Sequence, residues 1–321
     1  MDVCFGPCAT ARDARSPQMP CGAEVAFCRR GWTRARRPGR VDVMTTQVIH
    51  VGRDGWPLRG EIIGHGELVV MLHGGGPDHH SMRPLAHRLA HRYRVALPDI
   101  RGYGASVCRD PALHRWAQYV DDTIATVEAL GATSAHLVGA GLGGTIALRA
   151  CLRNPAMVRS AVIISAEAIE DDDDKAADTQ LMDDFADRTR STGLQSGWDL
   201  FLPHLHPLIA NLVREALPRS DAESAAAAAA IGHDRAFTTL DELALISTPT
   251  LVIAGDDARH PSDLAHALAN TLPQGRLSEV AMSHHLRDAE QMAEAFAPAI
   301  AEFLRAAERT HNDHRAPQPG R

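Results

Sequence analysis

Two side chains near the carboxyl end of the chain have the types needed for acid–base chemistry. Asp257 follows a predicted strand, Thr250–Ala254, and His284 follows the next predicted strand, Arg276–Ala281. A carboxylate can fix the tautomer of an imidazole, and the imidazole can then move protons near neutral pH. This order of acid and histidine predicts a hydrogen-bonded acid–imidazole pair, built from Asp256 or Asp257 and from His284 or His285.

Neighbouring residues leave alternatives open for both members of this pair. His284 and His285 are adjacent, so either could be the base. For the acid, Asp256 lies beside Asp257, and Glu167 follows an earlier predicted strand, Val158–Ser165. The acid is therefore one of three carboxylates.

A glycine-rich turn farther upstream has the frame of a nucleophile elbow, the strained strand-to-helix turn with the pattern G-x-S-x-G. Ala135–Gly139 is the predicted strand, and Gly139 and Gly143 match the two glycines of the pattern. The central position, where the pattern has serine, is Gly141. Without a hydroxyl or thiol at this position, the two-step route through an acyl-enzyme is excluded.

The same turn also fits a phosphate-binding loop, because Gly139, Gly141 and Gly144 have the spacing G-x-G-x-x-G before a helix. That fingerprint requires an acidic residue about 20 positions later. The sequence predicts the strand Val158–Ser165 there, and Glu167 comes late. The elbow is therefore the preferred interpretation, and we expect no cofactor.

A second glycine turn could supply hydrogen-bond donors to a substrate. His73–Gly76 follow the buried strand predicted at Leu68–Leu72. Glycines let the backbone turn sharply, and exposed N–H groups can hold an oxyanion. His79 and His80 come just after this turn and either line a pocket or face solvent. The stretch Asp99–Gly104 is predicted to shape the rim of the site, without a catalytic role.

Strands and helices alternate along most of the chain, which predicts an α/β fold with a mostly parallel, doubly wound sheet of the eight-stranded type. The remaining predicted strands are Thr46–Val51, Leu58–Ile63 and Val95–Leu97. The predicted helices are Ser81–Arg92, His114–Leu130, Thr145–Arg153, Pro261–Leu272 and Ala289–Arg309. The segment 166–240 interrupts the alternation and is too long for a loop, so it is predicted to be a helical cap.

The two ends of the chain lack periodic structure. Residues 1–43 are rich in Arg, Pro, Gly and Cys and are expected to be a disordered, dispensable extension. Met44 is a candidate start of the protein. The predicted domain is 44–309, and 310–321 is expected to be a frayed tail.

Composition excludes several classes of partner. The net charge of −7 argues against a nucleic-acid binder. No apolar run reaches the ~18–20 residues that span a bilayer, and the N-terminus has no apolar signal region. We therefore expect a cytoplasmic protein without a membrane partner, in an oligomeric state that the sequence does not indicate. Four early cysteines fit no paired C-x2-C pattern, so no metal site is expected: Cys4, Cys8, Cys21 and Cys28.

Residues 44–309 resemble the α/β-hydrolase family of the AB hydrolase-1 type. The matching pieces, besides the elbow frame and the late histidine, are His73-Gly74, Asp99–Gly104 and Pro249–Gly255. The resemblance implies that the backbone N–H groups of Gly75 and Leu142 hold an oxyanion. It also places the general base at His284, with His285 as the second choice. It places the acid at Asp257, with Asp256 and Glu167 in reserve, if the loop after strand Thr250–Ala254 is one residue shorter than usual.

We therefore expect an enzyme that acts without a serine nucleophile on a small, partly apolar substrate. His284, oriented by Asp257, would be the base, and Gly75 and Leu142 would hold the oxyanion. Hydrolysis, C–C cleavage, decarboxylation and cyclisation are all open to such a site. The alternative is an inactive hydrolase-fold protein that binds a small molecule or a partner. The resemblance allows both, since Ndr-like proteins are non-enzymatic and aminoacrylate hydrolases act on substrates that need little activation.

Overall fold

The computed structural model describes residues 46–167, 169 and 172–315. The predicted extension 1–43 and the last six residues, 316–321, lie outside the described part of the chain. None of the helices in the described part is long and apolar enough to cross a membrane.

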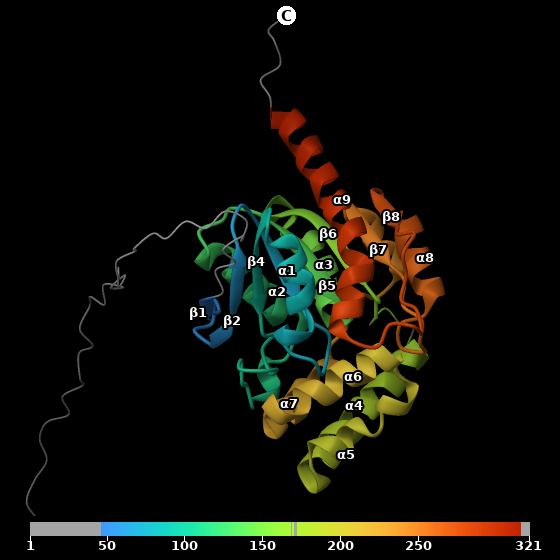
Figure 1. Ribbon diagram of the computed structural model, residues 1–321. Coiled ribbons are helices and arrows are strands. Elements are labelled where there is room, and N and C mark those ends of the chain that lie inside the picture. Colours follow the sequence, from blue (N-terminus) through green and yellow to red (C-terminus); the bar gives the residue numbers. More distant parts are fainter. Residues whose placement is uncertain (1–45, 168, 170–171, 316–321) are drawn as a thin grey trace, which may run out of the picture. The chain divides into compact units, whose positions relative to one another are not determined.

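The described strands form one eight-stranded sheet with the order β1-β2-β4-β3-β5-β6-β7-β8 (Figure 1). β2 runs antiparallel to β1 and β4, and the other neighbours are parallel. This mostly parallel sheet confirms the predicted fold class. The strands are β1 (Thr46–Val51), β2 (Pro57–Gly64), β3 (Glu67–Leu72), β4 (Tyr93–Pro98), β5 (Ala135–Ala140), β6 (Val158–Ile164), β7 (Thr250–Ile253) and β8 (Gly275–Leu277).

Helices cover both faces of the sheet, because the central strands are apolar on both sides. In β3, Val69 and Met71 belong to one buried cluster, whereas Val70 and Leu72 belong to another. This is the period-two alternation of a strand buried on both faces. The first cluster includes residues of α1 (Arg83–Leu89) and α9 (Ala289–Arg315), and the second includes residues of α2 (Trp116–Ala129), α3 (Leu142–Arg153) and α8 (Ser262–Thr271).

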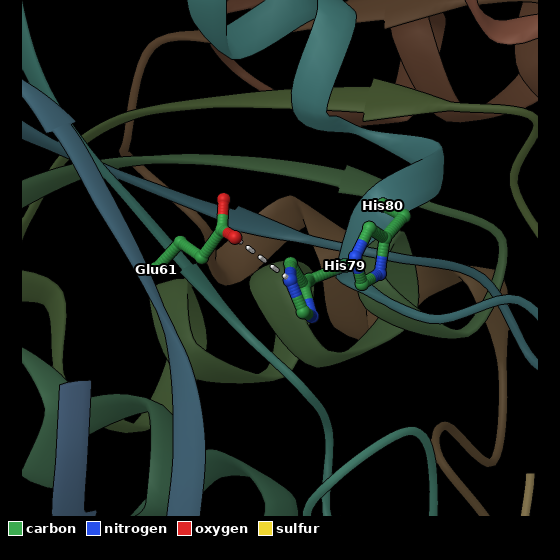
Figure 2. A group of neighbouring side chains, drawn as sticks. All are labelled: Glu61, His79 and His80. Atoms are coloured by element: carbon green, nitrogen blue, oxygen red, sulfur yellow. Dashed lines mark ion pairs between the residues drawn. The ribbon is translucent and has the colours of Figure 1, made fainter. Parts of the chain in front are cut away.

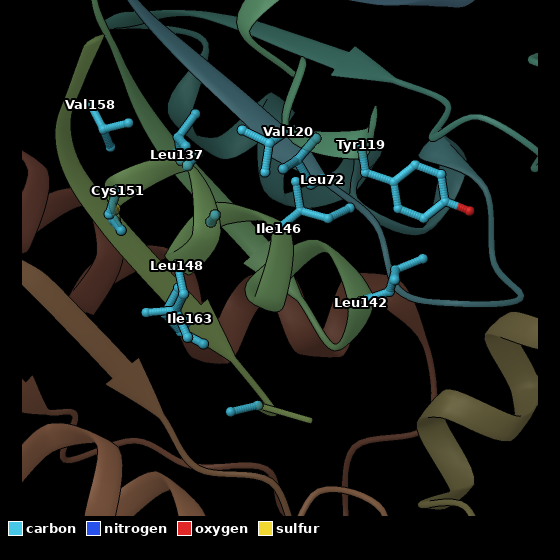
Figure 3. Close-up of a cluster of buried hydrophobic side chains, with 14 of the residues drawn as sticks. Leu72, Tyr119, Val120, Leu137, Leu142, Ile146, Leu148, Cys151, Val158 and Ile163 are labelled. Carbon is cyan, nitrogen blue, oxygen red and sulfur yellow. The ribbon is translucent and has the colours of Figure 1, made fainter. Parts of the chain in front are cut away.

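Helix α3 holds the turn at Gly141 in place through its apolar face. Leu142, Ile146 and Ala150 recur four residues apart and are buried in the cluster shared with the sheet and α2. Figure 3 shows Leu142 and Ile146 within this cluster. Residues four apart lie on one face of a helix, so a single stripe of α3 packs into the core. The first residue of this stripe is the one directly after Gly141, which fixes where the helix begins.

The segment between β6 and β7 forms a separate group of helices at one end of the sheet (Figure 1). Phe185, Trp198 and Phe201 pack together inside this group, with ring centroids 5.0–5.7 Å apart. The α-helices are α4 (Asp172–Thr192), α5 (Leu194–Trp198), α6 (Pro207–Ala216) and α7 (Ala222–Ala228).

The last strand and the last helix differ from their predicted lengths. β8 covers only three residues of the ladder, because the chain beyond it bulges: Ser278 and Met282 are four residues apart but donate to Val252 and Ala254, which are two apart. Helix α9 runs on to Arg315, so the first part of the predicted frayed tail is helical.

Backbone-to-backbone packing at the Gly141 turn makes one stability prediction. A Cβ atom on Gly143 would overlap the carbonyl oxygen of Leu72, although alanine is the better helix former at a helical position. We expect Gly143→Ala to lower the free energy of unfolding by about 1–3 kcal/mol, as overpacking does. Urea unfolding measures this loss.

Gly74→Ala is the matched control, because its added Cβ would meet its nearest atom at 3.6 Å, an ordinary contact. This control is expected to stay within about 0.5 kcal/mol of wild type. Equal stability of wild type and Gly143→Ala would show that the turn can relax.

Candidate active site

Gly141 forms the sharp turn between β5 and α3. Its backbone has φ 48° and ψ −117°, in the left-handed region that favours glycine. Its N–H donates to the carbonyl of Ile164 at 2.9 Å, and its own carbonyl accepts from Gly144 and Thr145 at 2.8 and 3.1 Å. Hydrogen bonds on both sides therefore pin this turn between two strands and a helix.

Two polar side chains lie where a side chain at position 141 would project. A Cβ atom built on Gly141 would be 3.3 Å from Glu167 Oε1 and 3.5 Å from His260 Nε2. The space above the turn is therefore bordered by a carboxylate and an imidazole.

His260 is held by Asp257 within a single turn directly after β7. Asp257 Oδ1 accepts from the backbone N–H groups of Arg259 and His260 at 3.0 and 2.9 Å, and it lies 2.8 Å from His260 Nδ1. Its other oxygen accepts from the backbone N–H of His206 at 2.7 Å. The carboxylate thus fixes both the turn and the ring, which leaves His260 Nε2 facing the space above Gly141.

Glu167 reaches this space because the chain kinks at the end of β6. Ser165 has φ 52°, the positive-φ conformation that non-glycine residues rarely adopt, and its N–H donates to Ile253 at 3.0 Å. The hydroxyl of Thr145, on α3, donates to the backbone carbonyl of Glu167 at 2.7 Å. Glu167 Oε2 then lies 3.3 Å from His260 Nε2, which completes a chain of three groups: Glu167, His260 and Asp257.

The charges of this chain favour a protonated imidazole. Burial opposes a charge on His260, but its contacts with Asp257 and Glu167 outweigh burial and raise its pKa to about 9. Burial is the largest single effect on the pKa of Asp257 and acts to raise it, but the contacts with His260 and the backbone N–H groups of His206 and His260 together outweigh burial and lower the pKa to about 2. The pKa of Glu167 is also lowered, since its interactions with His260 and Arg259 together outweigh burial. At neutral pH the site therefore contains an imidazolium between two carboxylates.

Backbone amides and a phenol lie on the other side of the same space. Gly75 lies beside α3, since a Cβ built on it would be 3.9 Å from Leu142 Cβ and 3.7 Å from the Tyr103 hydroxyl. No backbone or side-chain acceptor among the described residues is hydrogen-bonded to the amides of Gly75 and Leu142. Burial raises the pKa of Tyr103, so its phenol stays neutral and can donate. Gly75, Leu142 and Tyr103 all line the same cavity.

A cavity of about 120 Å³ connects these groups with the helices between β6 and β7. Its walls include Gly141, Glu167 and His260 on one side and Trp198 and Phe201 on the other, and they are mostly apolar. An apolar cavity of about 150 Å³ in another protein holds benzene, so this one fits a ligand of about one ring.

One polar group in the cavity wall has no partner. Ser165 is 2% exposed, and its hydroxyl has no hydrogen-bond partner in the described part of the chain. A buried hydroxyl without a partner is costly, and it can be satisfied by a ligand.

The structure does not bring the predicted base, His284, to this site. His284 and His285 are exposed, and within the described residues neither is hydrogen-bonded to Asp257. The Asp257 oxygens are occupied by His260 and His206, so the predicted contact between Asp257 and His284 is wrong.

Some of the other predicted site residues lie at the cavity and others do not. Asp256 is exposed, whereas Glu167, which the sequence held in reserve as the acid, lies in the site. Neither His79 nor His80 lines the cavity. Gly75, Gly141 and Leu142 all line it.

His260 is the functional candidate that the sequence interpretation missed. Its signal was available, because Asp257 and His260 are three residues apart in the shortened loop before Pro261. A histidine at this spacing can fold back onto a carboxylate that caps the turn. Tyr103 and Ser165 had no comparable signal, because only the folded strand ends bring them to the cavity.

Comparisons with known proteins agree with this architecture. Residues 69–299 match the Alpha/beta hydrolase family. A putative carbamate hydrolase, RutD, of Azorhizobium caulinodans is 30% identical over 239 residues, which cover 70% of this chain and 86% of the relative. A 2-hydroxymuconate semialdehyde hydrolase of Pseudomonas is 33% identical, but the match covers 33% of this chain and 38% of that protein. The structure of a thermophilic esterase from Thermogutta terrifontis superposes with a TM-score of 0.66 at 25% identity, covering 82% of this chain and 99% of the esterase.

Proposed function

This chain belongs to the alpha/beta hydrolase family, and from that premise we propose that it hydrolyses a small, partly apolar substrate without a serine nucleophile. The observation that carries the proposal is that two polar side chains, Glu167 and His260, border the space above Gly141 where a serine side chain would project. Glu167 Oε1 and His260 Nε2 lie 3.3 and 3.5 Å from the position of the absent Cβ atom. A water molecule, rather than a side chain, is then the nucleophile.

In the proposed reaction Glu167 is the base and His260 is the acid. Glu167 takes one proton from a water molecule above Gly141, and the water oxygen forms a bond to the substrate carbonyl carbon. The amides of Gly75 and Leu142 hold the negative charge that develops on the carbonyl oxygen.

The second half of the reaction breaks the bond to the leaving group. The departing nitrogen or oxygen takes the Nε2 proton of His260, whose pKa of about 9 keeps it protonated at neutral pH. Glu167 then returns its proton to His260 across their 3.3 Å contact, which restores the starting state. Water is the only co-reactant.

The leaving group and the cavity suggest the substrate class. An imidazolium acid suits a leaving group that needs a proton, such as the amine of a carbamate, and the relative from Azorhizobium is a putative carbamate hydrolase. The mostly apolar wall and the free hydroxyl of Ser165 favour a substrate with one short apolar group and one polar group. Small carbamates and esters are therefore the first substrates to try.

The two candidate histidines give the test of this proposal. We expect His260→Asn to lower kcat/KM by about 10²-fold or more on any small carbamate or ester that the wild type hydrolyses, as general acid–base residues do. His284→Asn is the matched control and is expected to stay within about twofold, since His284 is exposed and away from the cavity.

An equal loss of kcat/KM in His260→Asn and His284→Asn would contradict the assignment of the acid to His260 alone and would implicate His284, in the loop before α9. If none of the small carbamates and esters is hydrolysed but a ligand binds saturably in the cavity, the protein is a binding protein rather than an enzyme. The chain would then be a hydrolase-fold protein that binds a small molecule.

A further inference from the structure

Three possible metal ligands meet outside the walls of the cavity. Glu61 lies on β2, and His79 and His80 lie in the turn between β3 and α1 (Figure 2). One nitrogen or oxygen atom from each residue lies within 4.8 Å of the other two. Figure 2 shows the ring of His79 between the other two side chains.

His79 presents an unpartnered nitrogen to this group. Its Nδ1 lies 2.8 Å from Asp99 Oδ1, which fixes the ring. Its Nε2 is buried and has no hydrogen-bond partner in the described part of the chain, and it points at Glu61 Oε1 from 3.7 Å. This distance is too long for a hydrogen bond. It is close to the separation of about 3.4 Å between two ligands of a tetrahedral zinc ion with bonds of about 2.1 Å.

The other two possible ligands, His80 and Glu61, also have a charged neighbour on their second polar atom. His80 Nδ1 lies 3.2 Å from Asp78 Oδ1. Glu61 Oε2 forms an ion pair with Arg83, whose Nε lies 3.0 Å away but not in hydrogen-bond geometry. Metal-bound histidines and carboxylates typically have such partners on their second polar atom. The arrangement leaves Glu61 Oε1 and one nitrogen on each ring for a shared ligand.

Charge is compatible with a cation here. With neutral imidazoles the group contains three carboxylates, on Glu61, Asp78 and Asp99, and two guanidinium groups, on Arg83 and Arg219, which pairs with Asp78. The net charge is therefore negative by one. A divalent ion would reverse this balance and would satisfy the orphan nitrogen of His79.

We propose that Glu61, His79 and His80 bind a divalent transition-metal ion of the zinc class. Two imidazoles and one carboxylate are a ligand set that zinc uses with a fourth position left to water. The side chain of His80 is 40% exposed, so solvent reaches this edge of the group. The ion would tie β2 to the loop that carries Gly75, without taking part in the proposed hydrolysis.

The test is a titration of the full-length protein with ZnCl2 after EDTA treatment, followed by calorimetry. We expect wild type to bind one equivalent that both Glu61→Gln and His80→Ala lose. Cysteines elsewhere in the chain can add further equivalents, so the difference between variants is the measurement. Bound Co²⁺ should show ligand-field bands for this equivalent without a thiolate charge-transfer band.

A second adjacent histidine pair provides the control. His284 and His285 have the same 4.1 Å ring separation but are exposed. The double variant His284→Ala/His285→Ala is expected to keep the equivalent, which would separate a built site from adventitious histidine binding. Unchanged stoichiometry in folded Glu61→Gln and His80→Ala proteins would overturn the proposal, as would loss of the equivalent only in the His284/His285 variant.

Discussion

A fluorophosphonate probe is expected to leave the wild-type protein unlabelled and to label Gly141→Ser strongly only after Glu167 is shortened to alanine. The new serine would carry its hydroxyl within reach of His260 Nε2, which is 3.5 Å from the Cβ position. In the single variant, however, Glu167 Oε1 is only 3.3 Å from that Cβ, and it also keeps His260 protonated. A protonated imidazole cannot activate serine.

Removing the carboxylate of Glu167 both makes room for the serine side chain and removes one of the charges that keep His260 protonated. The pKa of His260 should then fall, because Glu167 is one of the two groups that raise it. If it returns to near 6.5, the neutral fraction at pH 7 rises from about 1% to most of the protein, so the double variant should label roughly 10- to 100-fold faster than Gly141→Ser. Gel fluorescence and peptide mapping measure the rate and the labelled residue.

Controls separate chemistry from folding. Serine at this positive φ carries strain of about 1–3 kcal/mol, so circular dichroism and a thermal melt come first. Glu167→Ala alone should stay unlabelled. A wild-type protein labelled at Ser165, the buried hydroxyl of the cavity wall, would show that the nucleophile is the residue after β6 and that our mechanism is wrong.

The pH dependence of hydrolysis is expected to separate the two possible bases. If Glu167 is the base and His260 the acid, kcat/KM should be level from about pH 5 to pH 9 and fall above it, where His260 loses its proton. A neutral His260 acting as the base would instead give a rate that rises up to about pH 9. Glu167→Gln should lower the rate by about 10²–10⁴-fold.

Unfolding provides an independent measurement of the same imidazolium. The pKa of His260 is about 9 in the folded protein and near 6.5 when unfolded, so its contribution to stability is complete below pH 6.5 and is lost as pH rises to about 9. At about 1.4 kcal/mol per pKa unit this amounts to roughly 3 kcal/mol. Glu167→Gln should flatten this decline. A stability that does not change over this range would show that His260 is neutral.

The order of elements was predictable from the sequence because the central strands β3, β5, β6 and β7 are short, mostly apolar runs followed by a glycine or polar turn. The elbow was predictable too, since Gly139 and Gly143 have no room for a Cβ atom and must therefore be glycines. The base was not. A histidine after β8 and a histidine within the turn after β7 look alike along the chain, and only the hydrogen bonds of Asp257 distinguish them.

Tertiary geometry decides the rest of the site. Glu167 enters it after the kink at Ser165, whose φ of 52° no local pattern signals for a non-glycine residue. The unexpected length of α9 and the bulge after β8 likewise depend on packing at the edge of the sheet.

The Asp257–His260 turn places the carboxylate and the imidazole that it orients within four consecutive residues. Where the two partners come from different strand ends, any movement of one loop separates them. Here the loop between β8 and α9 does not supply the histidine that pairs with Asp257, because His284 is exposed and Asp257 is paired with His260. That loop is therefore free to lengthen, shorten or change sequence during evolution without uncoupling the pair, and the whole unit can be grafted as Asp-Ala-Arg-His into another strand-to-helix connection.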